Sequence, residues 1–595
     1  MSYNTLTEMF IDVVKQHGAR TALMTKVKGQ YEGFTYEEFG RRVRNFALGL
    51  AALGIEKGDR VALFSENRPE WAITDLACLS LGATPCPIYP TLTESQIKYI
   101  LADSESKCVV ASKKEFVDKI LKMKDNIKPL KHIIAMEPVA ASADLIQFSE
   151  AMEKGRKFGE KHPDYYDNAT KNVADKDLAG LIYTSGTTGN PKGVMLSHKN
   201  IMSNVLAGLN VLSVSCEDVW LSFLPLCHVF ERMAGHFCAI TKGCTIAYAE
   251  SIDTVAQNLL EVRPTIMTSV PRLFEKIYSR VISNAEAGGT LKKKIFYWAL
   301  GTGEKYNAAT KAGKVTGGLK FKYNLANKLV FSKLQERTGG RIRFFISGGG
   351  PLPKEIGEFF YSAGIKVLEG YGLTESSPVI SVNHLDNFKF GSVGLNLPGQ
   401  EVKIADDGEI LTRGPHVMQG YFKQPEATKE VLDADGWLHT GDIGFIDEDE
   451  FLTITDRKKN LIVTSGGKNV APQPMENALL TSQYIQQVMI LGDSKKFISA
   501  LIVPDFGMLE KYANEHNIPY SNMDDLVSKD EIYRVVEKEV DRLLVNFARF
   551  EKVKKFLLLS KEFTIEDGEL TPTLKVKRKV VLDKYKDQID KLYKE

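Results

Sequence analysis

A loop rich in glycine and hydroxyl side chains spans residues 183–193 and reads YTSGTTGNPKG. Glycines let a ligand approach the backbone closely, and the Ser, Thr and single lysine of the loop, Lys192, can donate hydrogen bonds to phosphate oxygens. An apolar strand is expected before the loop and a helix capped by Ser197 after it, as in many phosphate sites. Because Pro191 stands where the Walker pattern needs its second glycine, an ordinary P-loop kinase is not expected. A plain surface turn of the same composition is the alternative.

Four later stretches also combine glycines with polar side chains. They are SGGGPL (347–352), GYGLTESS (370–377), GWLHTGDIG (436–444) and TDRKKNLIVTSGGKN (455–469). In the second, Thr374 could bond a phosphate and Glu375 could hold a hard cation through oxygen. In the third, the two oxygens of Asp442 suit the two hydroxyls of a ribose. Taken alone, each stretch could equally be a glycine turn, a helix cap or a solvated loop.

Taken together and in this order, the stretches resemble the motifs of the adenylate-forming superfamily of acyl-CoA synthetases, luciferases and peptide-synthetase adenylation domains. LCHVFE around His228 is similar to the acyl-site motif of that family, and LTPTLKVKRK is similar to its last motif, which places the catalytic lysine at Lys575. Leu574 stands where many relatives have glycine. Arg232 stands where one type of bacterial relative has a tryptophan that gates the acyl tunnel, so an identical gate is not expected.

LPLCHVFER, SVPRLFEKIY and the segment after them are most similar to the long-chain fatty-acyl branch. The resemblance implies activation of a long-chain fatty acid by ATP through an acyl-adenylate, with release of pyrophosphate, and then transfer to coenzyme A with release of AMP. ATP, Mg²⁺ and coenzyme A are therefore implied, with a fatty acid as substrate. Two alternatives stay open: a sibling ligase for another carboxylic acid, including an acyl-AMP ligase that does not use coenzyme A, and an inactive sensor of nucleotide or fatty acid.

The resemblance also implies site residues. The catalytic set is Lys575, His228, Lys192 and Thr374, the Mg²⁺ ligand is Glu375, and the hinge of a rotating C-terminal domain is Asp456. The implied nucleotide-binding and cofactor-binding residues are Thr184, Ser185, Gly186, Thr187, Thr188, Gly189, Lys192, Gly348, Gly349, Gly350, Tyr371, Gly372, Thr374, Asp442, Arg457, Lys459, Gly466, Gly467 and Lys468.

The elements that must position these motifs follow from the apolar pattern. From about residue 60, short apolar runs alternate with helical periods, which is typical of βαβ units around a mostly parallel sheet. At 595 residues the chain is also too long for one hydrophobic core. We therefore expect an α/β protein with a large N-terminal body of mostly parallel sheets, residues 1–455, and a small mobile α+β C-terminal domain, residues 456–595.

Composition limits the partners. Lys and Arg total 77 against 75 Asp and Glu, a net charge of +2, so no nucleic-acid partner is expected. Seven cysteines without a C-x-x-C pair predict reduced thiols and a cytoplasmic protein. No apolar run approaches the ~20 residues of a membrane-spanning helix. Oligomeric state and the preferred acyl length do not follow from the sequence.

A basic insertion, at about residues 285–340, interrupts the βαβ rhythm. Between residues 291 and 343 it has 13 Lys or Arg against only Glu304 and Glu336, with aromatic residues 296–298 beside lysines 292–294. A solvated helical hairpin is the simpler interpretation. The alternative is peripheral contact with an anionic membrane, on its inner face.

Overall fold

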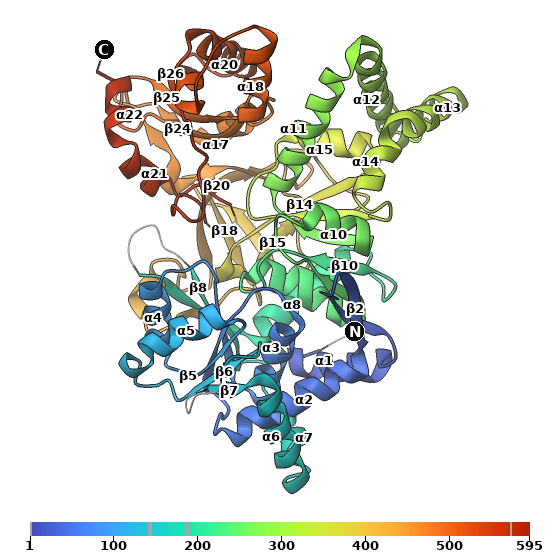
Figure 1. Ribbon diagram of the computed structural model, residues 1–595, viewed down its shortest axis with the longest axis vertical. Coiled ribbons are helices and arrows are strands. Elements are labelled where there is room, and N and C mark those ends of the chain that lie inside the picture. Colours follow the sequence, from blue (N-terminus) through green and yellow to red (C-terminus); the bar gives the residue numbers. More distant parts are fainter. Residues whose placement is uncertain (1–2, 141–144, 185–189, 572–573, 595) are drawn as a thin grey trace.

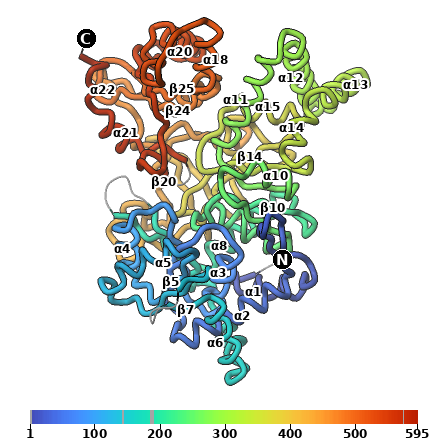
Figure 2. Tube along the Cα trace, viewed as in Figure 1, coloured from blue at the N-terminus to red at the C-terminus, as the bar shows by residue number. Residues whose placement is uncertain are grey.

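Two parts of unequal size make up the computed structural model, which describes residues 3–140, 145–184, 190–571 and 574–594. The larger part is N-terminal, and a smaller C-terminal part, coloured orange to red, lies at the upper left of Figure 1. The chain trace in Figure 2 shows the same arrangement. The larger part contains parallel sheets and the smaller one mixes helices with short strands, so the predicted α/β fold class is confirmed.

One sheet of the large part is entirely parallel, with strand order β4-β3-β5-β6-β7. Helices join β3 to β4, β4 to β5 and β5 to β6, so the predicted βαβ units are present. Nearly every residue of the three central strands is buried, as expected when both faces of a parallel sheet are covered. The elements are β3 (Arg60–Phe64), α3 (Pro69–Leu81), β4 (Thr84–Ile88), α4 (Glu94–Asp103), β5 (Ser106–Ala111), α5 (Lys114–Met123), β6 (His132–Ala135) and β7 (Leu145–Gln147).

A second sheet has nine strands in the order β16-β15-β14-β13-β12-β10-β11-β1-β2. Its strands from β14 to β1 pair in parallel, whereas β2, β15 and β16 pair antiparallel at the two edges. The strands are β1 (Thr21–Val27), β2 (Gln30–Thr35), β10 (Val219–Ser222), β11 (Thr245–Tyr248), β12 (Ile266–Ser269), β13 (Phe344–Ser347), β14 (Lys366–Gly372), β15 (Val379–Val382) and β16 (Leu395–Asn396).

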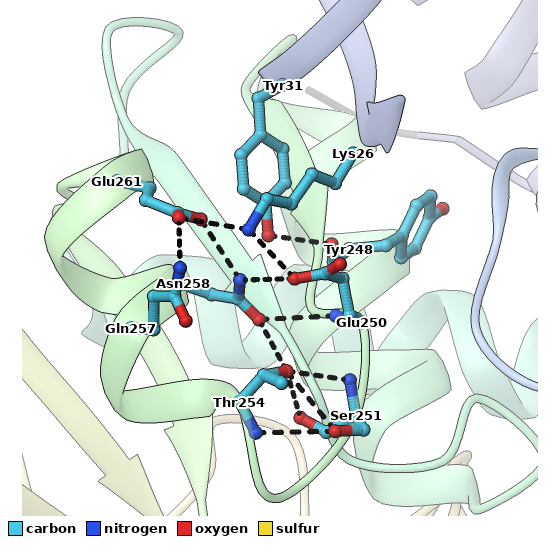
Figure 3. Close-up of polar contacts among 9 residues, drawn as sticks. All are labelled: Lys26, Tyr31, Tyr248, Glu250, Ser251, Thr254, Gln257, Asn258 and Glu261. Atoms are coloured by element: carbon cyan, nitrogen blue, oxygen red, sulfur yellow. Dashed lines mark hydrogen bonds and ion pairs between the residues drawn. The ribbon is translucent and has the colours of Figure 1, made fainter. Parts of the chain in front are cut away.

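A polar network connects β1, next to the edge strand β2 of this sheet, with the helix α10 (Val255–Val262) (Figure 3). The ammonium group of Lys26 lies 3.0 Å from a carboxylate oxygen of Glu250 and 2.9 Å from one of Glu261. Asn258 donates to both of these carboxylates, and its own oxygen accepts from the hydroxyl of Thr254 at 3.0 Å. The lysine side chain is nearly buried, so the two carboxylates compensate for its lost hydration.

The glycine-rich loop lies in a different setting from the one predicted. It joins two antiparallel strands, β8 (Leu178–Thr184) and β9 (Lys192–Ser197), whereas a direct connection from strand to helix was expected. The helix α8 (His198–Val211) follows β9, and the hydroxyl of its predicted N-cap, Ser197, accepts from the Asn200 amide at 3.1 Å. The strand β19 (Gly420–Tyr421) completes this sheet by pairing with β9. Residues 185–189, at the centre of the loop, lie outside the described residues.

A four-stranded antiparallel sheet leads from the large part to the C-terminal part, with strand order β17-β18-β20-β21. The C-terminal part has its own hydrophobic core around a three-stranded sheet, β24-β25-β26. The strands are β17 (Glu401–Ile404), β18 (Glu409–Arg413), β20 (Leu438–Ile446), β21 (Leu452–Arg457), β22 (Ile462–Val463), β23 (Asn469–Val470), β24 (Ile485–Leu491), β25 (Ile498–Pro504) and β26 (Val553–Leu558). Its helices are α17 (Pro472–Leu479), α18 (Phe506–Glu515), α19 (Met523–Val527), α20 (Asp530–Leu543), α21 (Arg578–Lys584) and α22 (Lys586–Leu592).

The basic insertion is helical, and it protrudes from the large part at the upper right of Figure 1. It contains α12 (Gly289–Lys311), α13 (Gly317–Ala326), the π-helix η3 (Asn327–Phe331) and α14 (Ser332–Arg337). The remaining helices of the large part with six or more residues are α1 (Leu6–His17), α2 (Tyr36–Ala52), α6 (Phe148–Lys161), α7 (Tyr165–Lys171), the π-helix η2 (Glu231–Phe237), α11 (Pro271–Ala287) and α15 (Lys354–Ser362). Short elements are α9 (Cys238–Thr241), α16 (Pro425–Lys429) and the 3₁₀ turn η4 (Thr374–Ser376).

All seven cysteines fall within the described ranges and are unpaired, as expected. Across the described residues there is no cluster of three or more His, Cys, Asp or Glu side chains that could hold a metal ion by themselves. None of the helices in the described part of the chain is both long and apolar enough to cross a membrane.

Candidate active site

A cavity of about 1840 Å³ lies between the two parts of the molecule. Residues of the large part and of the C-terminal part both line it, so it exists only while the two parts are in contact. Most of the predicted site residues that the structure describes meet here: Thr184, Lys192, His228, Gly348, Gly349, Gly350, Tyr371, Gly372, Thr374, Glu375, Asp442, Asp456, Arg457, Lys459 and Lys575.

Two groups of predicted residues are not part of this lining. Ser185, Gly186, Thr187, Thr188 and Gly189 lie outside the described residues. Gly466, Gly467 and Lys468 are described but form an exposed turn between β22 and β23, away from the lining. Gly467 has a φ of 71°, which explains a glycine at the tip of that turn. In this arrangement the turn is therefore separated from the residues that surround Asp442.

Asp442 lines the cavity and contacts two other residues of its lining. It lies on β20 directly opposite Arg457 on β21, and the Arg457 Nε atom is 3.0 Å from its Oδ1 atom. The hydroxyl of Tyr371, at the end of β14, donates to its Oδ2 atom at 2.7 Å. Burial raises the pKa of Tyr371 well above its usual value, so this hydroxyl remains a donor at neutral pH. Both carboxylate oxygens are thus fixed in a position where two ribose hydroxyls could share them.

Tyr421, a residue that was not predicted from the sequence, contacts both Glu375 and Lys192. Its hydroxyl donates to the Oε1 atom of Glu375 at 2.8 Å, and the Lys192 ammonium lies 4.8 Å from the centre of its ring. Tyr421 reaches this position because β19 pairs with β9, where it lies opposite Val194. It belongs to none of the motifs, and only the strand pairing reveals it.

The donor set around Glu375 fits Mg²⁺. A single carboxylate is sufficient for this ion when the phosphates of a bound nucleotide supply other oxygen ligands, because Mg²⁺ is rarely held in an all-protein cage. Thr374, the residue before it, is buried and begins η4 at the cavity wall. Carboxylate, hydroxyl and ammonium groups therefore meet in one region that suits a metal-bound polyphosphate.

His228 lies at the apolar end of the cavity. Its Nδ1 atom accepts a hydrogen bond from the Phe230 amide at 3.1 Å, so a neutral ring must have its proton on Nε2. Burial lowers the pKa of His228 to about 4, and the positive charge of Lys575 contributes further. The histidine is consequently a neutral hydrogen-bond donor at physiological pH. Apolar side chains also line the cavity, among them Leu209, Leu212, Val214, Val229, Phe230, Met233, Ala234 and Cys238.

Lys575 enters the cavity from the C-terminal part. Its backbone amide donates to the Thr571 hydroxyl at 3.0 Å, and an antiparallel bridge joins Leu570 to Val576, so the lysine lies in a tight turn. Desolvation by the cavity walls, together with repulsion from Arg457, lowers the pKa of Lys575 to about 8, although attraction to Asp442 opposes this shift. The side chain still reaches the solvent inside the cavity. It is therefore a cation at neutral pH that could bind an anion.

Leu574 and Arg232, the two departures from the expected motifs, have structural explanations. Leu574 has a φ of 63°, a left-handed conformation that favours glycine, which accounts for the glycine of many relatives at this position. Arg232 is buried, forms a two-fold ion pair with Asp75 at 2.7 and 3.0 Å, and donates to the Ala179 carbonyl at 2.8 Å. It lies behind the described lining of the cavity, so it does not take the place of a gating tryptophan.

Asp456 is the last buried carboxylate before the C-terminal part. It accepts from the Arg457 amide at 2.6 Å and from the Gln473 amide at 2.9 Å, and the second bond joins β21 to the start of α17. Burial raises the pKa of Asp456. Asp456 therefore ties the end of β21 to α17, a helix whose Met475 and Leu479 belong to the hydrophobic core of the C-terminal part.

Comparisons with known proteins agree with this geometry. The AMP-binding enzyme family matches residues 10–422, and the AMP-binding enzyme C-terminal domain matches residues 459–595. The long-chain-fatty-acid–CoA ligase FadD15 of Mycobacterium tuberculosis is 35% identical over 95% of this chain and 93% of its own. The fatty acyl-CoA synthetase A of Dictyostelium discoideum is 34% identical over 97% of this chain and 88% of its own.

Solved structures share the fold at lower identity. The adenylation domain of a carboxylate reductase from Mycobacterium chelonae superposes with a TM-score of 0.77 at 21% identity, over 99% of this chain and 91% of that one. The anthranilate CoA ligase AuaEII, solved in complex with anthranoyl-AMP, gives a TM-score of 0.74 at 18% identity, over 97% and 96% of the two chains. By motifs, fold and family match, the chain belongs to the AMP-binding enzyme family.

Proposed function

We propose that this protein is a long-chain fatty acid–CoA ligase that uses ATP and forms an acyl-adenylate intermediate. The observation that carries the proposal is the meeting of three groups in one cavity: a neutral His228, a cationic Lys575 and the fixed carboxylate of Asp442. The names of the relatives at 31–36% identity support the long-chain fatty acid as the substrate. The apolar lining beyond His228 suits an acyl chain.

In the first step, a fatty carboxylate attacks the α-phosphorus of ATP, and pyrophosphate leaves. Two anions must meet, so fixed cations and donors are needed where charge accumulates. The Nε2 proton of His228 would orient the carboxylate, and Lys575 would bridge the attacking oxygen and the α-phosphate. Lys192 and the adjoining loop would bind the β and γ phosphates, so they would stabilise the leaving group.

The nucleotide would be held at the opposite end. Asp442, held by Tyr371 and Arg457, would bind the ribose, while Gly348, Gly349 and Gly350 would border the adenine together with the Tyr371 ring. Thr374 would donate to the α-phosphate. Mg²⁺, when bound to Glu375 and the phosphates, would neutralise charge on the departing pyrophosphate. Tyr421 would orient the Glu375 carboxylate through its hydrogen bond.

In the second step, the coenzyme A thiol displaces AMP, and we propose that the C-terminal part rotates before this happens. The boundary would fall between residues 1–455 and 456–595, with Asp456 as the hinge. Lys575 would then leave the cavity, and the exposed turn of Gly466, Gly467 and Lys468 would enter it. The position of that turn outside the present lining supports this exchange.

Release of pyrophosphate with a panel of carboxylic acids, with and without coenzyme A, tests the proposal. Long-chain acids should give the fastest release, and coenzyme A should be consumed in step with AMP formation. Preference for an aryl or short-chain acid, or turnover that ignores coenzyme A, would identify a sibling ligase. No release with any acid would point to an inactive sensor and overturn the proposal.

The basic insertion suggests where the protein works. We propose a cytoplasmic protein that contacts the inner, anionic face of a membrane through this insertion, where fatty acids partition. Its excess of lysine and its projection from the large part support peripheral contact.

A further inference from the structure

Exposed apolar side chains collect on the basic insertion. On most folded domains such side chains are scattered singly, so a concentration of them needs an explanation. The exposed large apolar residues of the insertion are Leu291, Tyr297, Trp298, Val315, Phe321, Leu325 and Leu329.

Three of these residues form a stripe, here called the α13 stripe: Phe321, Leu325 and Leu329, which are 70, 41 and 44% exposed. They are four residues apart on α13 and the π-helix η3 that continues it, so they lie along one side of the helix. The opposite side of the helix packs against the rest of the protein. Tyr323 stacks on Tyr306 of α12 with ring centres 4.1 Å apart, and Ala326 is buried. The α13 stripe therefore faces away from the protein.

Lysines border the α13 stripe on both sides. Lys320, Lys322 and Lys328 are exposed, and none of the described carboxylates pairs with them. From residue 305 to residue 335 the chain has seven lysines and no Asp or Glu. An apolar stripe flanked only by positive charge is the pattern of a helix that lies in the surface of an anionic membrane.

We propose that the α13 stripe is the membrane-docking surface of this protein, with Phe321 entering the lipid headgroup region and the flanking lysines binding anionic headgroups. This inference rests on the membrane contact proposed above and specifies its residues. A second copy of the chain is a poor occupant, because a symmetric contact would place lysines against lysines. The protruding hairpin in Figure 1 can reach a flat surface before the rest of the large part does.

The patch that the sequence suggested, residues 292–298, is partly engaged within the protein. Phe296 is buried, and Lys293 and the Tyr297 hydroxyl both bind the carboxylate of Glu286 on α11. These contacts hold α12 against α11, whereas Lys292, Lys294 and Trp298 remain exposed. Neutralising lysines 292–294 is accordingly expected to weaken membrane binding less than changes in the α13 stripe.

Flotation of the full chain with lipid vesicles tests the inference. Vesicles of equal parts phosphatidylcholine and phosphatidylglycerol should bind the protein, and binding should weaken as salt is raised. Phe321→Ser should reduce the affinity by about tenfold through lost apolar contact. Lys320→Gln with Lys322→Gln should reduce it by roughly fivefold for each lysine removed.

Matched controls separate this surface from general effects. Leu260→Ser removes an apolar side chain from α10 that is 52% exposed, and Lys128→Gln with Lys131→Gln removes two exposed lysines elsewhere. These controls should bind vesicles like the unaltered protein. Every variant should keep its rate of pyrophosphate release when the fatty acid is delivered on serum albumin, so a failed ligase assay and a failed membrane assay are distinguishable.

Three outcomes would overturn the inference. The first is an unaltered protein that does not float with the anionic vesicles, or that floats equally with pure phosphatidylcholine. The second is normal vesicle binding by the Phe321→Ser and double-lysine variants. The third is a concentration-dependent oligomer of the unaltered protein that Phe321→Ser converts to monomer, which would assign the stripe to contacts between copies.

Discussion

Asp442 and Lys575 line the same cavity but are held in opposite ways. Asp442 lies within a sheet and has a partner on each carboxylate oxygen, Arg457 and Tyr371. Lys575 is positioned by its backbone in a turn, and its ammonium has no hydrogen-bond partner among the described residues. One side of the cavity is therefore organised before substrate arrives, while the other presents a cation whose ammonium is not fixed by hydrogen bonds to the described residues, which is compatible with the departure proposed above. A site that must catalyse two successive reactions needs both properties.

Removing the Lys575 ammonium should have the largest effect. Lys575→Ala is expected to slow acyl-adenylate formation by about 100- to 1000-fold, since a charged group that acts mainly in the transition state is lost. Thiolation of supplied acyl-AMP should change little. Measuring each half-reaction separately checks this, with the exposed Lys586→Ala as a control. An equal loss in both half-reactions would contradict a role of Lys575 in adenylate formation alone.

Changing Asp442, on the organised side of the cavity, should weaken the binding of ATP. Asp442→Asn keeps the shape of the side chain but places an amide against the Arg457 and Tyr371 donors. We expect the KM for ATP to rise by roughly 10- to 100-fold, the usual range for hydrogen bonds to a charged group, with a smaller change in kcat. Steady-state kinetics measure both, and Asp435→Asn, on an exposed turn, is the control. A loss confined to kcat would contradict a binding role.

The pH dependence of adenylate formation probes the ionisation of Lys575. Its ammonium form predominates below the pKa of about 8 and is lost as the pH rises through that value. Only about one tenth of the lysines remains charged one unit above it, so the rate should fall about tenfold from pH 7 to pH 9. His228, with a pKa of about 4, stays neutral throughout this range. Lys575→Arg should flatten the profile, and an unchanged profile would assign the titration to another group.

Tyr421→Phe should give the smallest change. The substitution removes the hydrogen bond to Glu375 but leaves the ring beside Lys192. The Mg²⁺ concentration needed for half-maximal rate should rise by about two- to tenfold, the value of one ordinary hydrogen bond. Titrating Mg²⁺ at saturating ATP measures it. If the Mg²⁺ requirement of this variant matched that of the unaltered protein, Tyr421 would be only a packing residue.

Local patterns in the sequence predicted much of this arrangement. The parallel strands and the cap at Ser197 follow from apolar periodicity and from hydroxyl chemistry, which act over a few residues. The meeting of His228, Asp442 and Lys575 in one cavity was anticipated only through the resemblance of motifs. Their proposed roles are still to be tested by the experiments above.

Pairing between strands that are distant in the chain could not be predicted from the sequence. The two strands of the hairpin around the glycine-rich loop, β8 and β9, are neighbours in the chain, but β9 also pairs with β19, which is remote in the chain. Tyr421 was missed for that reason. Arg232 takes the sequence position of the gating tryptophan of one type of relative, but only the structure shows that its side chain turns away from the cavity lining to meet Asp75. Neither the pairing partner nor the direction of a side chain can be read from spacing alone.

Leu574 restricts the conformation of the turn that carries Lys575. A glycine at position 574 would let the turn flip among many conformations, whereas Leu574, held at a φ of 63°, leaves it few. The turn that carries Lys575 thus has few accessible conformations, so the rotation of the C-terminal part proposed above would supply most of the movement of the lysine. For protein engineers, position 574 offers control over how precisely the lysine is aimed, independently of its charge.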